Sequence, residues 1–217
     1  MTLVLLVRHA DTPVAGKVLT GWSRGVHLNE RGLEQARGLV ERLEPVPIAA
    51  VYSSPLERCC ETAAPLARAR GLEVRVRRAL LEVDYGEWTN RSIRQLARTK
   101  RWQAVQRTPS SFRFPGGESL RGVQARAVDA VRAIAEEHPN DAVMIVSHAD
   151  VVRLVLAELA GIHLDLYQRL AVAPASVSAV ALGDGQTRVL TVNDTGSLAS
   201  LAPPAPVRRR RSPKMAG

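Results

Sequence analysis

The chain has 217 residues, of which 46% are hydrophobic and 24% are charged, which is ordinary for a globular protein. Its net charge is +9, but Arg208 to Arg211 and Lys214 supply five of these charges from the last ten residues, leaving about +4 for the other 207. With 4% aromatic residues and no apolar run near the ~20 residues of a membrane span, we expect neither a nucleic-acid stacking platform nor a membrane protein. The body charge suits a small anionic substrate at least as well.

Strands and helices are expected to alternate along the chain. Apolar runs predict strands at 3–7, 48–52, 72–76 and 142–146, and a closing antiparallel pair at 177–182 and 188–192. Helical spacing and turn signals predict helices after Asn29, from 54 to about 70, between 92 and 105, from Ser119, and from 150 to 159. This alternation is typical of a three-layer α/β/α sandwich with a mainly parallel sheet. Such sheets bind ligands at the carboxyl ends of their strands.

Local signals define the first two helices further. The first helix is expected to bury an apolar face that includes Leu33. The second carries a helix-start signature, in which Ser54 is the N-cap, Pro55 takes the first helical position and Glu57 completes a capping box. Gly71 is expected to stop this helix.

Residues suited to phosphate chemistry follow several of the predicted strands. Arg8 and His9 come directly after the first strand, Arg58 lies in the first turn after the second, and Glu82 follows the third. His148 comes directly after the strand at 142–146. An arginine offers a fork of donors to a phosphate, and a neutral histidine can attack phosphorus. Because the ends of parallel strands share one edge of the sheet, these side chains are expected to meet there.

The segments around these residues match a known family pattern. The chain resembles the histidine phosphatase superfamily, which includes the cofactor-dependent phosphoglycerate mutases, over about residues 1 to 195. It also looks like an actinobacterial subgroup of probable phosphomutases through residues 114–119 and 165–169. The segments that carry the family resemblance are Arg8-His9, Leu19-Thr20-Gly21-Trp22, Leu28-Asn29-Glu30-Arg31-Gly32, the helix opening at 53–63, Glu82, Pro115-Gly116-Gly117-Glu118-Ser119 and Ser147-His148.

The resemblance implies a role for each member of the constellation. His9 would be the nucleophile and form a phosphohistidine, and its neutral form is favoured by the flanking arginine charges. Arg8, Arg58 and His148 would hold the phosphoryl oxygens and stabilise the transition state. Glu82 would donate a proton to the leaving oxygen and then activate water. No metal or other cofactor is expected, because phosphoryl transfer needs mainly positioning and charge stabilisation.

Further substrate contacts, and departures from the family pattern, lie near these residues. The resemblance implies contacts at Thr20 and Gly21, and the helix that starts near Ala149 could add backbone N–H donors to the phosphate. Many relatives have glycine where this chain has Ala10 and Ala149, so a positive φ at either position would be costly. Many also have asparagine where this chain has Ala15, which predicts weaker phosphate binding or a substitute group.

Three functions fit the constellation. Mutases of this family carry a longer segment around the acid, whereas Glu82 is followed by the short segment 83–88, which favours a phosphomonoester hydrolase acting on a small phosphorylated metabolite. A phosphoglycerate mutase-type phosphomutase is the alternative, and a non-catalytic phosphate-binding or interaction protein is the third hypothesis. Asp84 competes with Glu82 for the role of acid.

One histidine phosphatase domain is expected at residues 1–200, followed by a disordered, Pro- and Arg-rich tail at 203–217. Only this tail has the charge density of a nucleic-acid contact, so nucleic acid is not an expected partner. The N-terminus lacks a signal-peptide pattern, and the two cysteines, Cys59 and Cys60, are adjacent and predict no disulfide framework. A cytoplasmic location and no membrane contact are therefore expected. The oligomeric state is left open, and a homodimer is one of the states that we consider.

Overall fold

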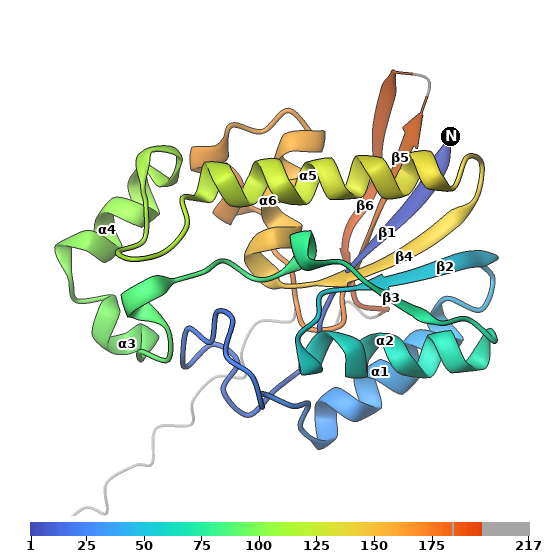
Figure 1. Ribbon diagram of the computed structural model, residues 1–217, viewed down its shortest axis with the longest axis horizontal. Helices are drawn as coiled ribbons and strands as arrows, with labels where there is room; N and C mark the ends of the chain where they lie inside the picture. Colours follow the sequence, from blue (N-terminus) through green and yellow to red (C-terminus); the bar gives the residue numbers. More distant parts are fainter. Residues whose placement is uncertain (184, 197–217) are drawn as a thin grey trace, which may run out of the picture.

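The computed structural model describes residues 1–183 and 185–196, which build one six-stranded sheet with helices on both faces (Figure 1). The strand order is β3-β2-β4-β1-β5-β6. The pairings β2–β3, β2–β4 and β1–β4 are parallel, and β1–β5 and β5–β6 are antiparallel. The three-layer, mainly parallel sandwich expected from the sequence is confirmed. The strands are β1 (Thr2–Arg8), β2 (Ile48–Ser53), β3 (Val74–Val76), β4 (Ala142–Ser147), β5 (Val177–Gly183) and β6 (Gln186–Asp194).

The two faces of the sheet are covered by different helix pairs. Helices α1 and α2 pack together on one face, and α5 and α6 pack together on the other (Figure 1). Alternate side chains of β1 pack on opposite faces of the sheet. Val4 and Leu6 belong to the core under α5 and α6, while Leu5 and Val7 belong to the core under α1 and α2. The long helices are α1 (Glu30–Arg42), α2 (Glu57–Ala69), α5 (Leu120–Glu137) and α6 (Ala149–Leu159).

Strand β4 is the most deeply buried part of the sheet. It lies between β2 and β1, and its residues from Val143 to Val146 are fully buried. A parallel strand that is covered on both faces needs a continuous apolar sequence rather than an alternating one, and this explains the run Ala142-Val143-Met144-Ile145-Val146. The strand therefore holds the polar residues that follow it, Ser147 and His148, at a rigid edge.

Two of the local helix predictions are wrong. Leu33 is 41% exposed, and the buried face of α1 is instead formed by Gly32, Ala36 and Leu39. Helix α2 begins at Glu57, its N-cap is Leu56, and no side chain caps it, so Ser54 does not have the predicted capping role. By contrast, Ser119 caps α5 as expected, because its Oγ accepts a hydrogen bond from the Gly122 amide at 3.2 Å.

The segment between β3 and α5 consists of short helices, and it lies to one side of the sheet (Figure 1). The single helix expected between 92 and 105 is divided into α3 and α4, because Thr99 caps a new helix start through its Oγ. Gly86 has a φ of +52° and packs so closely on Pro115 that a Cβ would lie 2.1 Å from its carbonyl oxygen. The helices of this segment are η1 (Arg78–Leu80), η2 (Gly86–Trp88), α3 (Ile93–Leu96), α4 (Lys100–Arg107) and η3 (Pro109–Ser111), and a further one, η4 (Leu164–Arg169), follows α6.

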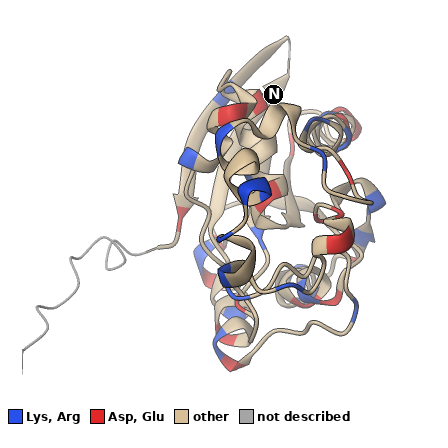
Figure 2. Cartoon of the chain, turned by 90° about the vertical axis from the view of Figure 1, so that its left-hand side faces the viewer, with Lys and Arg blue, Asp and Glu red and all other residues tan. Residues whose placement is uncertain are grey.

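Charged residues are spread over the described surface. Figure 2 shows basic and acidic residues interspersed on the side that it displays, without a continuous basic band there. Within the described ranges, no helix is both long enough and apolar enough to span a bilayer. The predicted basic tail at 203–217 lies outside the described residues, as does the end of the predicted domain from 197 to 200.

Candidate active site

The residues expected to carry phosphate chemistry come together at the carboxyl edge of the sheet. Arg8 is paired in register with Ser147, so His9 and His148 follow neighbouring strands, and their rings lie 5.3 Å apart between centroids. The His9 amide donates to the Ser147 carbonyl at 2.8 Å. Arg58 reaches the same place from the first turn of α2.

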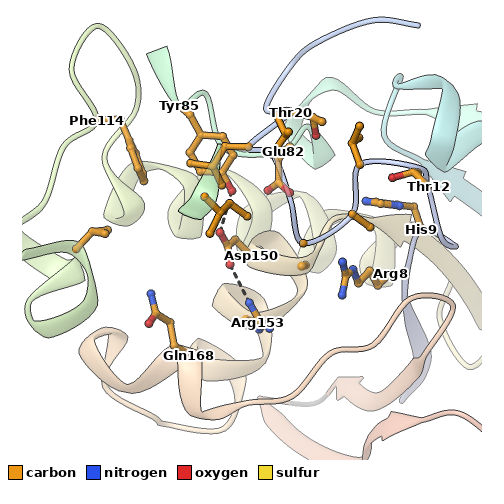
Figure 3. A pocket seen from close by; sticks show the side chains of 18 of the residues that line it. Arg8, His9, Thr12, Thr20, Glu82, Tyr85, Phe114, Asp150, Arg153 and Gln168 are labelled. Carbon is orange, nitrogen blue, oxygen red and sulfur yellow. Dashed lines mark hydrogen bonds and ion pairs between the residues drawn. The ribbon is translucent and has the colours of Figure 1, made fainter. Parts of the chain in front are cut away.

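A pocket of about 480 Å³ opens at this edge, which is a size suited to a small-molecule ligand. Arg8 and His9 lie at one end of it, while Phe114 and Gln168 lie at the other (Figure 3). Glu82, which follows η1, points into the pocket. The side chains of Arg58 and His148 do not line the pocket directly and are almost completely buried behind it.

His9 is held as a neutral ring with one nitrogen available for attack. Its Nδ1 lies 2.8 Å from the carbonyl oxygen of Ala10, and because a carbonyl can only accept, Nδ1 carries the proton. Burial, and then the charges of Arg58 and Arg8, lower the pKa of His9 to about 3. The imidazole is therefore neutral at physiological pH, and its Nε2 keeps a lone pair.

Arg8, which is partly buried, and Arg58, which is almost completely buried, are two cations anchored by backbone carbonyls. Nη1 of Arg8 donates to Val172 at 2.7 Å, and Nη2 of Arg58 donates to Gly21 at 2.8 Å. The Nε atoms of both arginines are buried, and within the described chain neither has a hydrogen-bond partner. Buried cations with unsatisfied donors are costly on their own, and an oxyanion would satisfy them. The arrangement fits a phosphate group.

His148 contacts three residues of the site. Its Nε2 lies 2.8 Å from the Ser54 hydroxyl and 3.5 Å from the Cys59 thiol, and its Nδ1 lies 4.0 Å from a carboxylate oxygen of Glu82. Burial, followed by the charges of Arg58 and His9, lowers the pKa of His148 well below its usual range. His148 is therefore a neutral hydrogen-bonding group and not an additional cation.

The pKa of Glu82 is shifted in the opposite direction to those of His9 and His148. Burial, followed by the negative charge of Asp150, raises the pKa of Glu82 to about 7. Its Oε1 accepts from the Val83 amide at 2.9 Å, and its carbonyl accepts from the Trp22 indole at 2.6 Å and from Arg126 at 2.9 Å. A fixed carboxyl group that exchanges its proton near neutral pH is suited to general acid and base chemistry.

Asp84, the predicted competitor for the acid role, is turned away from the pocket. Its Oδ1 accepts from the Gly86 amide at 2.9 Å, and it does not contribute to the described lining. The geometry therefore favours Glu82 as the acid.

The other predicted contact residues occupy different places. Thr20 and Ala149 line the pocket, and Ala149 is the first residue of α6. Gly21 lies behind Arg58 and contacts it through its carbonyl. The strain expected at Ala10 and Ala149 does not arise, because neither has a positive φ. Ala15 lines the pocket.

Sequence reasoning missed two kinds of residue. Ser54 was assigned to a helix cap and Cys59 was given no role in the site, yet both contact His148. Asp150 was seen only as a helix start, yet its carboxylate lies in the pocket and pairs with Arg153. The position of Asp150, two residues after His148, was the available signal, because the first turn of a helix that starts at a strand end faces the site.

Comparison with known proteins identifies the family. The family model described as histidine phosphatase superfamily (branch 1) matches residues 4–195. The chain belongs to this superfamily. The predicted family and the predicted class, a histidine phosphatase enzyme, are therefore confirmed, whereas the resemblance to an actinobacterial subgroup stays a prediction.

Named relatives of this histidine phosphatase include phosphatases and mutases. Phosphoserine phosphatase 1 of Hydrogenobacter thermophilus is 30% identical over 206 residues, which cover 90% of this chain and 93% of the relative. A probable phosphoglycerate mutase, GpmB of Cronobacter sakazakii, is 28% identical and covers 83% of this chain and 85% of its own. Among solved structures, Bacillus stearothermophilus YhfR superposes with a TM-score of 0.83 at 27% identity, covering 89% of this chain and 98% of its own.

Proposed function

We propose that this histidine phosphatase hydrolyses phosphomonoesters of a small metabolite through a phosphohistidine at His9. The observation that carries the proposal is the pair of opposite pKa shifts in one pocket, with a neutral His9 and a Glu82 that is partly protonated near pH 7. A nucleophile without its proton and an acid with its proton are the two states that the first chemical step requires.

In the first step, Nε2 of His9 attacks phosphorus while the bond from phosphorus to the alcohol oxygen breaks. Arg8, Arg58 and His148 donate hydrogen bonds to the phosphoryl oxygens, where negative charge is spread in the transition state. Glu82 gives its proton to the departing oxygen, so that the alcohol leaves in its neutral form. The unsatisfied Nε donors of the two arginines support this assignment.

In the second step, water attacks the phosphohistidine. The Glu82 carboxylate takes a proton from the water, the bond between phosphorus and Nε2 breaks, and inorganic phosphate leaves. Both groups return to their starting protonation states. Nδ1 of His9 keeps its proton throughout, because the Ala10 carbonyl continues to accept from it.

Hydrolysis is preferred over isomerisation because of the short segment after Glu82. A mutase must hold a bisphosphate and protect its phosphohistidine from water, and the segment 83–88 turns immediately through Gly86 into η2. A relative named as a phosphoserine phosphatase supports the phosphatase function, and relatives named as probable phosphoglycerate mutases keep the mutase as the second candidate. A non-catalytic phosphate-binding protein is the third.

Comparison of two histidine variants tests the proposal. His9→Ala is expected to abolish the metal-independent hydrolysis of a chromogenic phosphomonoester measured in the presence of a chelator. The matched control is His27→Gln, because His27 is exposed and pairs with Glu61 away from the pocket lining. Equal activity of the wild type and His9→Ala would contradict the mechanism. Phosphate binding without turnover of any phosphoester would favour the non-catalytic alternative.

Product analysis separates the hydrolase from the mutase. With 3-phosphoglycerate, in the presence and absence of 2,3-bisphosphoglycerate, we expect any reaction to release inorganic phosphate. Formation of 2-phosphoglycerate that depends on the bisphosphate would make the protein a mutase. The cytoplasmic location and the homodimer are carried forward as predictions, and sedimentation of the purified protein tests the second.

A further inference from the structure

An acidic side chain lies in the pocket where the alcohol part of a substrate would be placed. Asp150 lines the pocket, and in Figure 3 it lies between Glu82 and Arg153 on the side away from His9. One of its carboxylate oxygens accepts from the Tyr85 hydroxyl at 2.9 Å, and the other pairs with Nη1 of Arg153 at 3.1 Å. Because Asp150 and Arg153 are three residues apart on α6, the helix itself holds the pair together.

The cation of this pair is already engaged. Arg153 donates from Nε to the Leu170 carbonyl at 3.0 Å and from Nη1 to Asp150. Apart from Arg8, Arg153 is the only cation of the described pocket lining. Arg8 and the buried Arg58 are positioned for the phosphoryl group, so the alcohol end of the pocket has no unpaired positive charge.

The walls around the pair are also poorly suited to a second anion. Phe114 lies at this end of the pocket (Figure 3), and Ile93, Trp102 and Val105 are further apolar residues of the lining, which also includes Gln106 and Gln168. Trp102 lies near Trp88, with a 6.1 Å separation of ring centroids, and Phe114 contacts Tyr85 edge-on. A carboxylate moved from water to such surroundings loses hydration, and the cation that it meets there, Arg153, is already paired with Asp150.

From this arrangement we infer that the protein selects phosphomonoesters whose alcohol part is uncharged, and that Asp150 is a specificity-determining residue that disfavours a second anionic group. The inference rests on the proposed function, because it assumes that the phosphoryl group is held at His9. A carboxylate or a second phosphate on the alcohol would face the Asp150 charge. Hydroxyl groups would find both an acceptor in Asp150 and donors in Arg153.

A matched pair of substrates measures this selection. Glycerol 3-phosphate and 3-phosphoglycerate differ only in that a hydroxymethyl group of the first is a carboxylate in the second, and their leaving oxygens are both primary alcohols. We expect kcat/KM for glycerol 3-phosphate to be higher by about tenfold, the size of a like-charge contact in a partly solvated site. An equal or higher value for 3-phosphoglycerate would overturn the inference.

The variant Asp150→Asn tests the residue. Asparagine keeps an acceptor for Tyr85 but removes the negative charge, so the preference for glycerol 3-phosphate is expected to fall by about fivefold or more. Any change in the chemistry at Glu82 affects both substrates alike and cancels in the ratio of their kcat/KM values. Asp129→Asn, on the exposed side of α5, is the charge-matched control. A ratio that is unchanged in Asp150→Asn contradicts the assignment of Asp150.

Binding measurements separate this inference from the proposed function. Calorimetry compares 3-hydroxypropylphosphonate with 3-phosphonopropionate, neither of which can be hydrolysed. If the hydroxyl compound binds more tightly to the wild type, and this preference is lost in Asp150→Asn, the selection against anionic groups is supported. This holds even if no phosphoester is hydrolysed, and in that case only the proposed hydrolysis fails. If both esters are hydrolysed and both phosphonates bind equally well, the proposed hydrolysis is supported and the selection against anionic groups is contradicted.

Discussion

His9 and Glu82 share a pocket but have pKa values displaced in opposite directions by burial. The sequence predicted both residues as candidates, and it also predicted that arginine charges would keep His9 neutral. It could not predict the raised pKa of Glu82, because this depends first on burial of the carboxyl group and then on Asp150, which reaches the pocket from a helix 68 positions further along the chain. It also led us to expect backbone strain at Ala10 and Ala149, which does not arise, because neither residue has a positive φ.

The pH dependence of activity follows from these two values. The first step needs protonated Glu82, so kcat/KM for an alkyl phosphomonoester is expected to fall above about pH 7, where Glu82 loses its proton. His9, with a pKa of about 3, should contribute no loss on the acid side until that region. In Glu82→Gln the fall above pH 7 should disappear, and the rate should drop by about 10²–10⁴-fold. If kcat/KM of Glu82→Gln still falls above pH 7, the titrating group is not Glu82.

Phosphate binding by Arg58 can be tested by measuring the thermal stability of the protein. Phosphate that binds only the folded state raises the melting temperature, and the increase grows with the ratio of the phosphate concentration to its Kd. Arg58→Met removes a buried cation, so the increase in melting temperature with added phosphate is expected to be lost, together with about 10²-fold or more of activity. Arg68→Met is the matched control, because Arg68 lies exposed on the same helix. A full phosphate response in Arg58→Met would exclude Arg58 from the phosphate site.

At the scale of the elements, the positions of strands and long helices were predictable, whereas their ends were less so. The apolar run of β4 and the cap at Ser119 are local signals, and the structure agrees with both. Ser54 has the same local signal as Ser119 but a different role, because its hydroxyl is used by His148, which lies 94 positions away. The helix between 92 and 105 divides for a local reason, the Thr99 cap, which the apolar pattern obscured.

The two serines give a direct comparison. Ser119→Ala removes a helix cap and should lower the free energy of unfolding by about 1 kcal/mol, with little effect on kcat/KM. Ser54→Ala removes a hydrogen-bond partner of buried His148, and at the start of α2 it removes only a long contact of 3.5 Å with the Leu56 amide, so kcat/KM should fall by about tenfold. Unfolding curves and kinetics of both variants check this pair. If Ser54→Ala keeps full activity, its contact with His148 has no part in catalysis.

At the scale of the whole molecule, the order of strands in the sheet makes the site. β1, β4 and β2 are spatial neighbours although they are separated in the sequence, and their carboxyl ends bring together His9, His148 and the start of α2. The hydrophobic patterns predicted the strands and their shared carboxyl edge, but not their order in the sheet. The pocket walls could not be predicted in the same way, because α3, α4 and η4 are placed by tertiary packing of short, irregular segments.

The described lining of the pocket comes from positions well before the C-terminal segment. Among the residues that the structure describes, those that line the pocket lie between positions 8 and 168. A protein truncated after Leu201 is therefore expected to keep its kcat/KM within about twofold, a change of well under 1 kcal/mol. The comparison is made with the full chain on the same phosphomonoester. A larger loss would show that the basic segment contributes to substrate binding.

The most direct test of the mechanism is to trap its intermediate. The protein is mixed with a labelled phosphomonoester, denatured in alkali within the first turnover, and digested for mass spectrometry, because phosphohistidine survives base. We expect the phosphoryl group on His9 in the wild type and on no residue in His9→Ala. Label on a different side chain, or phosphate released at the full rate without any labelled histidine, would contradict the assignment of His9 as the nucleophile.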